Sequence, residues 1–247
     1  MTEEALRSVK VSGSGTVAGG RYDRVKGSGS VRIDGDVVAH SIETSGSMKS
    51  HGNLRVEWLR SSGSAAVEGD VSTVRGHASG SWRVSGNVRI DEEAKISGSA
   101  HVDGSLAGEA VVGSGSLRVR GDIALESLVW SGAINCPGLV SADTVDIRLG
   151  GACQLGELAG SSISVRAGMN ASPWLAWLNF SRTQRLTVGE ISGDDIRLEH
   201  TEARVVRGDR VSIGSHCRVD RVEYRKDFTV HSDAWVGESV RVEGNGQ

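Results

Sequence analysis

The chain has 247 residues and a net charge of −3, from 28 Lys and Arg against 31 Asp and Glu, so no global field attracts nucleic acid or an acidic partner. Aromatic residues make up only 4%, which disfavours a base-stacking surface, while two prolines and 34 glycines suit β-structure with many tight corners. The N-terminal string MTEEALRSVK contains no apolar run. We therefore expect no signal peptide, and a flexible tail over residues 1–9.

Between residues 29 and 132, glycines recur with spacings of 17, 17, 17, 18, 17 and 17 residues. We call them the corner glycines: Gly29, Gly46, Gly63, Gly80, Gly98, Gly115 and Gly132. A second glycine follows each of them six residues later, from Gly35 to Gly138. Such a strict period predicts a stack of near-identical units, none of which can bury a core alone.

Apolar residues recur two, four, eight and thirteen residues after each corner glycine, as at Val31, Ile33, Val37 and Ile42. This alternation has the period of a strand, and glycine suits the corners where the alternation breaks. Ser50, Gly76 and Glu93 depart from the pattern. Because the unit that contains Glu93 has one extra residue, we expect Ala94 to take its core position.

The sequence therefore predicts an all-β protein, a single-stranded β-helix (β-solenoid) of about 17-residue coils stacked ~4.8 Å apart. A first β-helix segment is expected over residues 10–166. A second is expected over 186–242, continuing the rod, with a tail over 243–247. One non-repeat segment, 167–185, interrupts them.

The interruption contains GMNASPWLAWLNFSRTQ, in which Ser172 and Pro173 suit the start of a short helix. Its apolar tip with basic flanks is compatible with contact with a membrane interface or a partner. The favoured interpretation is a loop or short helix that packs on the flank of the rod, because burial of apolar residues is commoner than an exposed patch. The candidate contact residues are Trp174, Leu175, Trp177, Leu178 and Phe180.

Residues that carry chemistry are sparse. Cys136, Cys153 and Cys217 are far apart in the sequence, which fits a reducing cytosol, and Cys136 occupies a core position. The seven histidines are scattered, and the Gly-Ser strings recur without the helix and lysine of a phosphate loop. We expect no enzyme, and no catalytic, cofactor-binding or metal-binding residue.

One long string supports a resemblance: ISGDDIRLEHTEARVVRGDRVSIGSHCRVDRVEYRKDF, from Ile191 to Phe228. Together with units such as GSGSVRIDGDVVAHSIETSG, it resembles the bactofilin-like, polymer-forming cytoskeletal proteins of Gram-positive spore-forming bacteria. The resemblance extends from about Tyr22 to Tyr224. It implies a right-handed β-helix that associates end to end into filaments without nucleotide. Bactofilins proper have a shorter core and often a hydrophobic N-terminal targeting peptide, which we do not expect in this chain.

We accordingly expect a self-assembling cytoskeletal scaffold that organises proteins of the cell envelope, because open strand edges invite pairing. Its partners would be further copies of itself and the membrane surface or envelope-associated proteins, with no nucleic acid. It would be cytoplasmic and able to associate with the inner face of the membrane. The alternatives are a β-helical enzyme of the hexapeptide acyltransferase type, suggested by Ile213-Gly214 and Val219, and a non-polymerising binding scaffold. The residues expected at the assembling ends are Val9, Val11, Val17, Trp235, Val236, Val240 and Val242.

Overall fold

The structure is a computed structural model that describes residues 6–168 and 184–242. Within these ranges all regular structure is strand, and no helix occurs. The chain divides into two compact units, Met1–Gly121 and Asp122–Gln247. In each unit the strands pair in parallel and in chain order, as coils of a β-solenoid, so the predicted fold class is confirmed.

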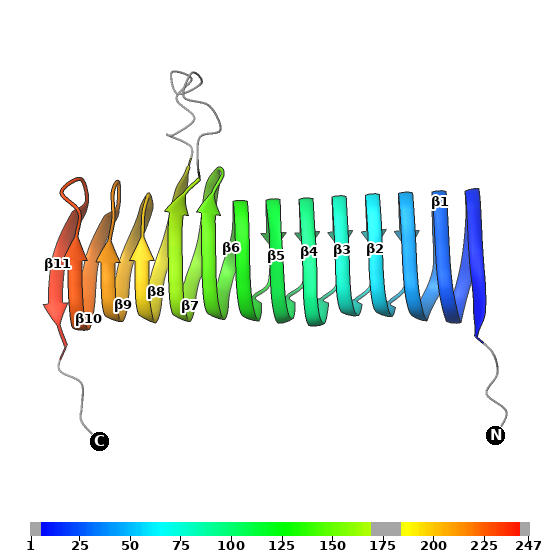
Figure 1. Cartoon of the computed structure of the whole chain (residues 1–247), viewed down its shortest axis with the longest axis horizontal. Coiled ribbons are helices and arrows are strands. Elements are labelled where there is room, and N and C mark those ends of the chain that lie inside the picture. Colours follow the sequence, from blue (N-terminus) through cyan, green and yellow to red (C-terminus); the bar gives the residue numbers. More distant parts are fainter. Residues whose placement is uncertain (1–5, 169–183, 243–247) are drawn as a thin grey trace, which may run out of the picture. The chain divides into compact units, whose positions relative to one another are not determined.

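Unit 1 consists of strands that follow one another side by side along the solenoid (Figure 1). They are β1 (Arg7–Ser50), β2 (Leu54–Val67), β3 (Val71–Val84), β4 (Val88–Val102) and β5 (Leu106–Val119). The strand β1 spans more than one coil and begins at Arg7, within the range 1–9 that we expected to be a tail. The corner glycines Gly46, Gly63, Gly80, Gly98 and Gly115 lie in register from coil to coil.

The corner glycines are required by both backbone conformation and space. All seven have positive φ, for example +119° at Gly46 and +107° at Gly80, where side chains are strained. A Cβ atom on Gly80 would also lie 2.2 Å from the carbonyl oxygen of Gly63 in the preceding coil. This corner is therefore closed to any other residue, which explains the period in the sequence.

The second corner of the coil in unit 1 is closed by side chains. The backbone N–H of Asn53 donates to Asp36 Oδ1 at 2.7 Å, and the backbone N–H of Asp70 donates to Asn53 Oδ1 at 2.8 Å. In the next coil, the backbone N–H of Asn87 donates to Asp70 Oδ1 at 2.7 Å. Each Asp or Asn follows a second glycine in the sequence, so the signal was available as a repeated Gly-Asp or Gly-Asn pair. Our sequence analysis missed this role.

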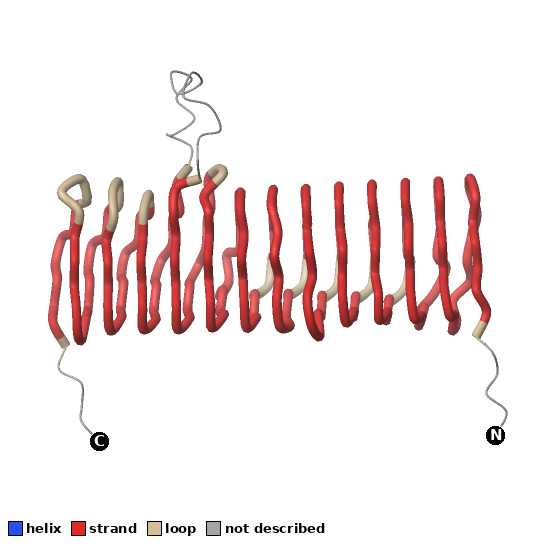
Figure 2. Tube along the Cα trace, viewed as in Figure 1, coloured by secondary structure: helices blue, strands red, loops and turns tan. Residues whose placement is uncertain are grey.

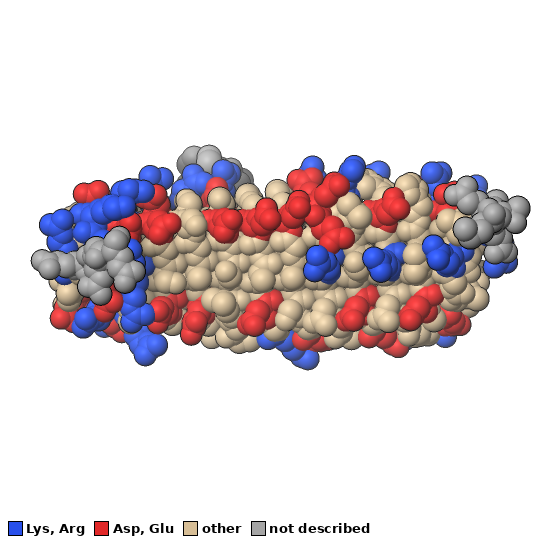
Figure 3. All heavy atoms as spheres, turned by 90° about the horizontal axis from the view of Figure 1, so that it is seen from below, with Lys and Arg blue, Asp and Glu red and all other residues tan. Residues whose placement is uncertain are grey.

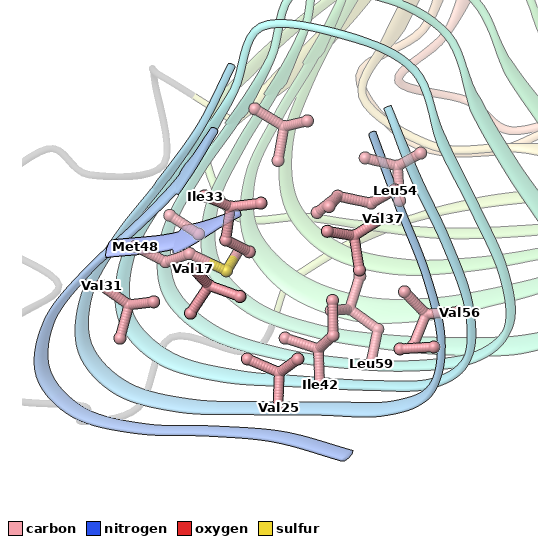
Figure 4. Packing of buried hydrophobic residues seen from close by; sticks show 14 of the residues in the cluster. Val17, Val25, Val31, Ile33, Val37, Ile42, Met48, Leu54, Val56 and Leu59 are labelled. Carbon is pink, nitrogen blue, oxygen red and sulfur yellow. The ribbon is translucent and has the colours of Figure 1, made fainter. Parts of the chain in front are cut away.

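The core of unit 1 consists of columns, by which we mean residues at the same coil position that stack from one coil to the next. Val25, Ile42 and Leu59 form one such column (Figure 4). Its next members are Gly76, Ala94 and Val111, paired in this order, and Ala94 is 5% exposed. The prediction that Ala94 replaces Glu93 is thus confirmed.

Small residues in unit 1 are matched by one large side chain. Trp82 lies in register between Ala65 and Ala100, whose small side chains in the same column leave space for its indole. The missing side chain at Gly76 nevertheless leaves an apolar cavity of about 50 Å³, which Trp82 helps to line. Ser50, the polar exception, is fully buried, and its hydroxyl donates to the Gly52 carbonyl at 3.3 Å.

Unit 2 keeps the columns but changes one corner. Its strands are β6 (Ile123–Leu149), β7 (Ala152–Ala167), β8 (Arg185–Leu198), β9 (Thr201–Ile213), β10 (Arg218–Val230) and β11 (Trp235–Arg241). Between them lie short loops such as 199–200, 214–217 and 231–234 (Figure 2). These loops lie at the same coil position as the corner formed by Gly132. The contact of Gly150 with Gly132 shows this, since the backbone N–H of Gly150 donates to the Gly132 carbonyl at 2.9 Å.

Candidate functional site

Neither unit contains a recognisable reaction centre within the residues that the structure describes. No group of three His, Cys, Asp or Glu side chains in that part of the chain could hold a metal ion. The cavity beneath Gly76, at about 50 Å³, is far smaller than the ~300–1,000 Å³ of typical ligand sites. Two larger hollows, of about 490 Å³ beside Tyr22 and His40 and of about 410 Å³ beside Arg207 and Glu223, lie open on the surface. Attention therefore turns to the outer strands of the two units.

The histidines and cysteines serve local structure. The rings of His200 and His216 lie 4.7 Å apart in an edge-to-face arrangement, at successive loops with positive φ. Burial lowers the pKa of His200, so it is not simply a solvated surface histidine. Cys136, Cys153 and Cys217 are all buried, and none of them forms a disulfide. Burial raises the pKa of Cys217 to about 11, which disfavours a reactive thiolate.

The Trp-rich segment lies outside the described residues. Trp174, Leu175, Trp177, Leu178 and Phe180 belong to 169–183, the stretch between β7, which ends at Ala167, and β8, which begins at Arg185. Membrane or partner contact and packing on the solenoid both stay predictions. No helix in the described part of the chain is long and apolar enough to cross a membrane.

At the outer edge of unit 1, the first coil leaves its apolar residues incompletely covered. Val9 and Val11 in β1 are half-buried and pack on the core, whereas Val17 is 3% exposed. Val9 precedes Gly13 by four residues, as Val25 precedes Gly29 and Ile42 precedes Gly46. By this spacing Val9 begins the same column as Val25 and Ile42, and its outward side has no neighbour among the described residues.

At the outer edge of unit 2, β11 carries the expected residues in different orientations. Trp235 is 47% exposed, and the Arg218 guanidinium lies 4.4 Å from its ring centroid as a cation–π contact. Val236 is half-buried and lies in register with the buried Val219. Val240 lies in register with Glu223, so it does not continue a core column. Val242, just beyond the strand, is exposed.

The structure adds two residues to this edge that our sequence analysis did not nominate. Phe228 and Val230 of β10 lie in register with the buried Val211 and Ile213 of β9. The strand β11 pairs with β10 only between Arg218 and Tyr224, so it does not cover them. Val230 is consequently 50% exposed. The signal was present in the sequence, since both residues continue the apolar rhythm of the preceding coils.

Charge pairs fix the strands around this edge, and Lys and Arg side chains gather over β9–β11 (Figure 3). Arg221 donates to Glu223 at 2.7 Å and to Glu238 of β11 at 2.9 Å. Arg207 also donates to Glu223, at 2.8 Å. Arg221 and Arg207 together lower the pKa of the Glu223 carboxyl. These side chains are partly exposed, so the network orients β11 on β10 more than it stabilises the fold.

The comparisons with known proteins assign no activity. No protein-family model matches the sequence, and no solved structure matches it. The chain is similar to the uncharacterized protein YhbE of Bacillus subtilis (strain 168), with 34% identity over 108 residues. The match covers 42% of this chain and 44% of that protein, so the chain spans less than half of the length of the relative.

Proposed function

We propose that this chain is a structural protein that self-assembles through the strand edges of its β-solenoid and acts as a bactofilin-like cytoskeletal scaffold. Assembly would need neither nucleotide nor metal. The observation that carries the proposal is the state of the two outer edges. At each edge, apolar residues of core columns, such as Val9 and Val230, are left partly exposed by the described strands.

The physical argument rests on unpaired backbone as well as on apolar surface. A parallel strand with no neighbour presents a row of N–H and C=O groups, and such an edge accepts another strand unless charge, proline or a covering segment prevents it. Neither β11 nor the start of β1 contains proline, and the charged residues of these strands, Arg7, Lys10, Glu238 and Arg241, are all exposed and so leave the apolar columns free of charge. The resemblance of Ile191–Phe228 to polymer-forming proteins supports the same function.

Electron microscopy of the purified protein, without nucleotide and with EDTA, tests the proposal. We expect ordered polymers from the wild type. The variants Val9→Lys and Val230→Lys should shorten or abolish them, because each places a charge on an apolar column at the joint. As a matched control, Ser116→Lys on the exposed serine corner of unit 1 should leave polymers intact. Dispersed particles of wild-type protein at high concentration would overturn the proposal.

A further inference from the structure

The interior of unit 1 has one place where neighbouring coils leave space unfilled. The column that contains Ile42 and Leu59, whose side chains lie inside the coil (Figure 4), continues with Gly76 and Ala94. A larger side chain returns only at Val111. Two successive coils therefore contribute no more than a single methyl group to this column, and the cavity of about 50 Å³ lies beside them.

The length of one coil adds to this shortage of side-chain volume. The coil between Gly80 and Gly98 has 18 residues, whereas the coils on either side have 17. The strand β4 accommodates the extra residue as an irregularity between Ile90 and Glu93, and the residue that then enters the column is Ala94. The coil thus gains backbone without gaining a large side chain in the core.

Two core residues beside the cavity are less buried than their neighbours. Val88 lies in register between Val71 and Leu106, which are each 2% exposed, yet Val88 itself is only half-buried. Trp82 occupies a core column and is likewise half-buried. Because both residues line the cavity, part of their surface lacks the dispersion contacts that close packing provides.

The charged and imidazole side chains of the lining belong to its outer side. Lys95 pairs with Glu93 at 3.0 Å, and His101 pairs with Asp103 at 2.9 Å. His77 lies in register with the exposed Lys95, in a column that faces away from the core. The interior of the cavity is therefore left to apolar side chains.

Two further polar groups in the lining do not form a site for water. Thr73 is 4% exposed, and its hydroxyl donates to the Arg75 carbonyl at 2.9 Å. Trp82 Nε1 is buried, and no described residue accepts a hydrogen bond from it. A buried water typically makes about three hydrogen bonds, and apolar cavities without such partners stay dry. The cavity therefore favours an apolar occupant over water.

The volume of the cavity limits what can enter it. An engineered apolar cavity of about 150 Å³ in another protein holds no water and binds benzene or xenon. At about 50 Å³, the cavity of unit 1 is too small for a benzene ring but can accept one xenon atom or a molecule of a few non-hydrogen atoms. The indole of Trp82 supplies a large polarisable surface for such an occupant.

We propose that this cavity is a binding site for one small, uncharged, apolar molecule, held against the indole of Trp82 where Gly76 lacks a side chain. The occupant restores contacts that the lining residues lack, and it stabilises the folded state by mass action. The site lies inside the coils of unit 1, so its occupancy does not depend on the proposed self-assembly.

Xenon is the probe, and the tryptophan side chains report where it binds. Protein that is isotopically labelled at the indole nitrogens is sedimented and measured by magic-angle-spinning NMR at increasing xenon pressure, so the readout is the same for monomers and polymers. The signal that is lost in Trp82→Phe belongs to Trp82 Nε1. We expect this signal to shift and to saturate with pressure. The signal of Trp130, which is buried in unit 2 and does not line the cavity, should stay in place.

Three glycine variants locate the site. Gly76→Ala occupies part of the cavity and should weaken xenon binding by about tenfold or more, and Gly76→Val should abolish it. Thermal melts check that both variants fold, and Gly76→Ala decides alone if the larger side chain prevents folding. As a matched control, Gly151→Ala adds the same methyl group in unit 2, where its Cβ meets only Ala133 Cβ at 3.7 Å, and should leave binding unchanged.

Three results would overturn the proposal. The first is a wild-type Trp82 signal that does not shift, or that shifts without saturation. The second is a saturable shift that keeps its wild-type affinity in the folded Gly76 variants, which would place the xenon elsewhere. The third is a water signal coupled to Trp82 Nε1–H at every xenon pressure, which would make the occupant a bound water.

Discussion

Unit 1 and unit 2 share their apolar columns but close the same corner of the coil by different means. In unit 1 the corner consists of glycines with positive φ, held against the backbone of the preceding coil, as at Gly80. In unit 2, after the glycine corner at Gly132, the corner consists of loops whose positive-φ residues include His200 and His216. The difference teaches that the core columns define the fold, whereas the corner is a conformational problem with more than one solution.

The two solutions differ in what they tolerate. A glycine corner packed on the preceding backbone keeps the coil length nearly constant, at 17 residues except for the 18 between Gly80 and Gly98, and side-chain bonds such as Asn53 to Asp36 span the same 17 residues. A loop releases this constraint, so the separation between paired residues varies in unit 2, as it does between Val188 and Ala203 and between Val219 and Val236.

The largest expected effect is common to both units and tests whether the columns define both. Val119→Asp in unit 1 and Ile196→Asp in unit 2 each place an unpaired charge in a core column and should each lower the free energy of unfolding by several kcal/mol. The exposed neighbours supply matched controls, since Arg118→Asp and Arg197→Asp should change it little. Thermal melts of the four variants decide. Equal losses within either pair would contradict the assignment of faces.

Substitutions at the corner should change the free energy of unfolding in opposite directions in the two units. Gly80→Ala adds a Cβ 2.2 Å from a carbonyl oxygen at a φ of +107°, so it should destabilise by about 1–3 kcal/mol. His216→Gly removes the strain of a side chain at a φ of +58° and should stabilise by up to about 1 kcal/mol. Chemical denaturation measures both. A tolerated Gly80→Ala would mean that the glycine corner is not required.

The side-chain corner of unit 1 should depend on an acceptor and not on a charge. Asp70→Ala leaves the Asn87 amide without its 2.7 Å acceptor and should cost about 1–2 kcal/mol. Asp70→Asn keeps an oxygen in place and should cost much less. Denaturation of both variants distinguishes these cases, and an equal loss for Asn and Ala would show that the carboxylate charge matters instead.

Filling the defect in the unit 1 column should stabilise the fold slightly. Gly76→Ala places its Cβ 3.5 Å from Ala94 Cβ and 3.7 Å from Thr73 Cγ2, which are ordinary contacts. The filled part of the cavity and the restricted unfolded chain should together contribute up to about 1 kcal/mol. A melting temperature below that of the wild type would mean that this position needs glycine for another reason.

The smallest effect concerns pH and belongs to unit 2. Burial lowers the folded-state pKa of His200 below its ordinary value of 6.5, so the unfolded chain binds the proton more readily. Stability should therefore fall as the pH drops through 6.5 towards the folded-state pKa, before the carboxyl groups titrate. His200→Asn, which suits positive φ, should remove this part of the pH dependence. Thermal melts of both proteins between about pH 7.5 and about pH 5 test this pH dependence.

Much of the fold was predictable because it repeats. The inward positions of unit 1 followed from alternation alone, and an insertion could be placed correctly at Ala94 because its neighbours above and below fixed the register. The Asp and Asn corner was missed because a Gly-Asp pair signals a turn without indicating what its side chain binds.

At the outer edge of unit 2, the sequence analysis nominated the last apolar residues in chain order. Phe228 and Val230 come earlier in the chain yet lie at the same edge, since β11 covers only part of β10. Which residues are left uncovered depends on where the last strand ends within the coil. A linear reading of apolar residues does not contain that geometry, whereas strand pairing gives it directly.

Sedimentation velocity of the wild-type protein tests the central claim, self-assembly through the strand edges, most directly. The samples span a range of concentrations in buffer with EDTA and without nucleotide. The account predicts species well above the 26.0 kDa monomer, whose proportion rises with concentration. A single monomeric species at every concentration, up to high micromolar, would contradict it.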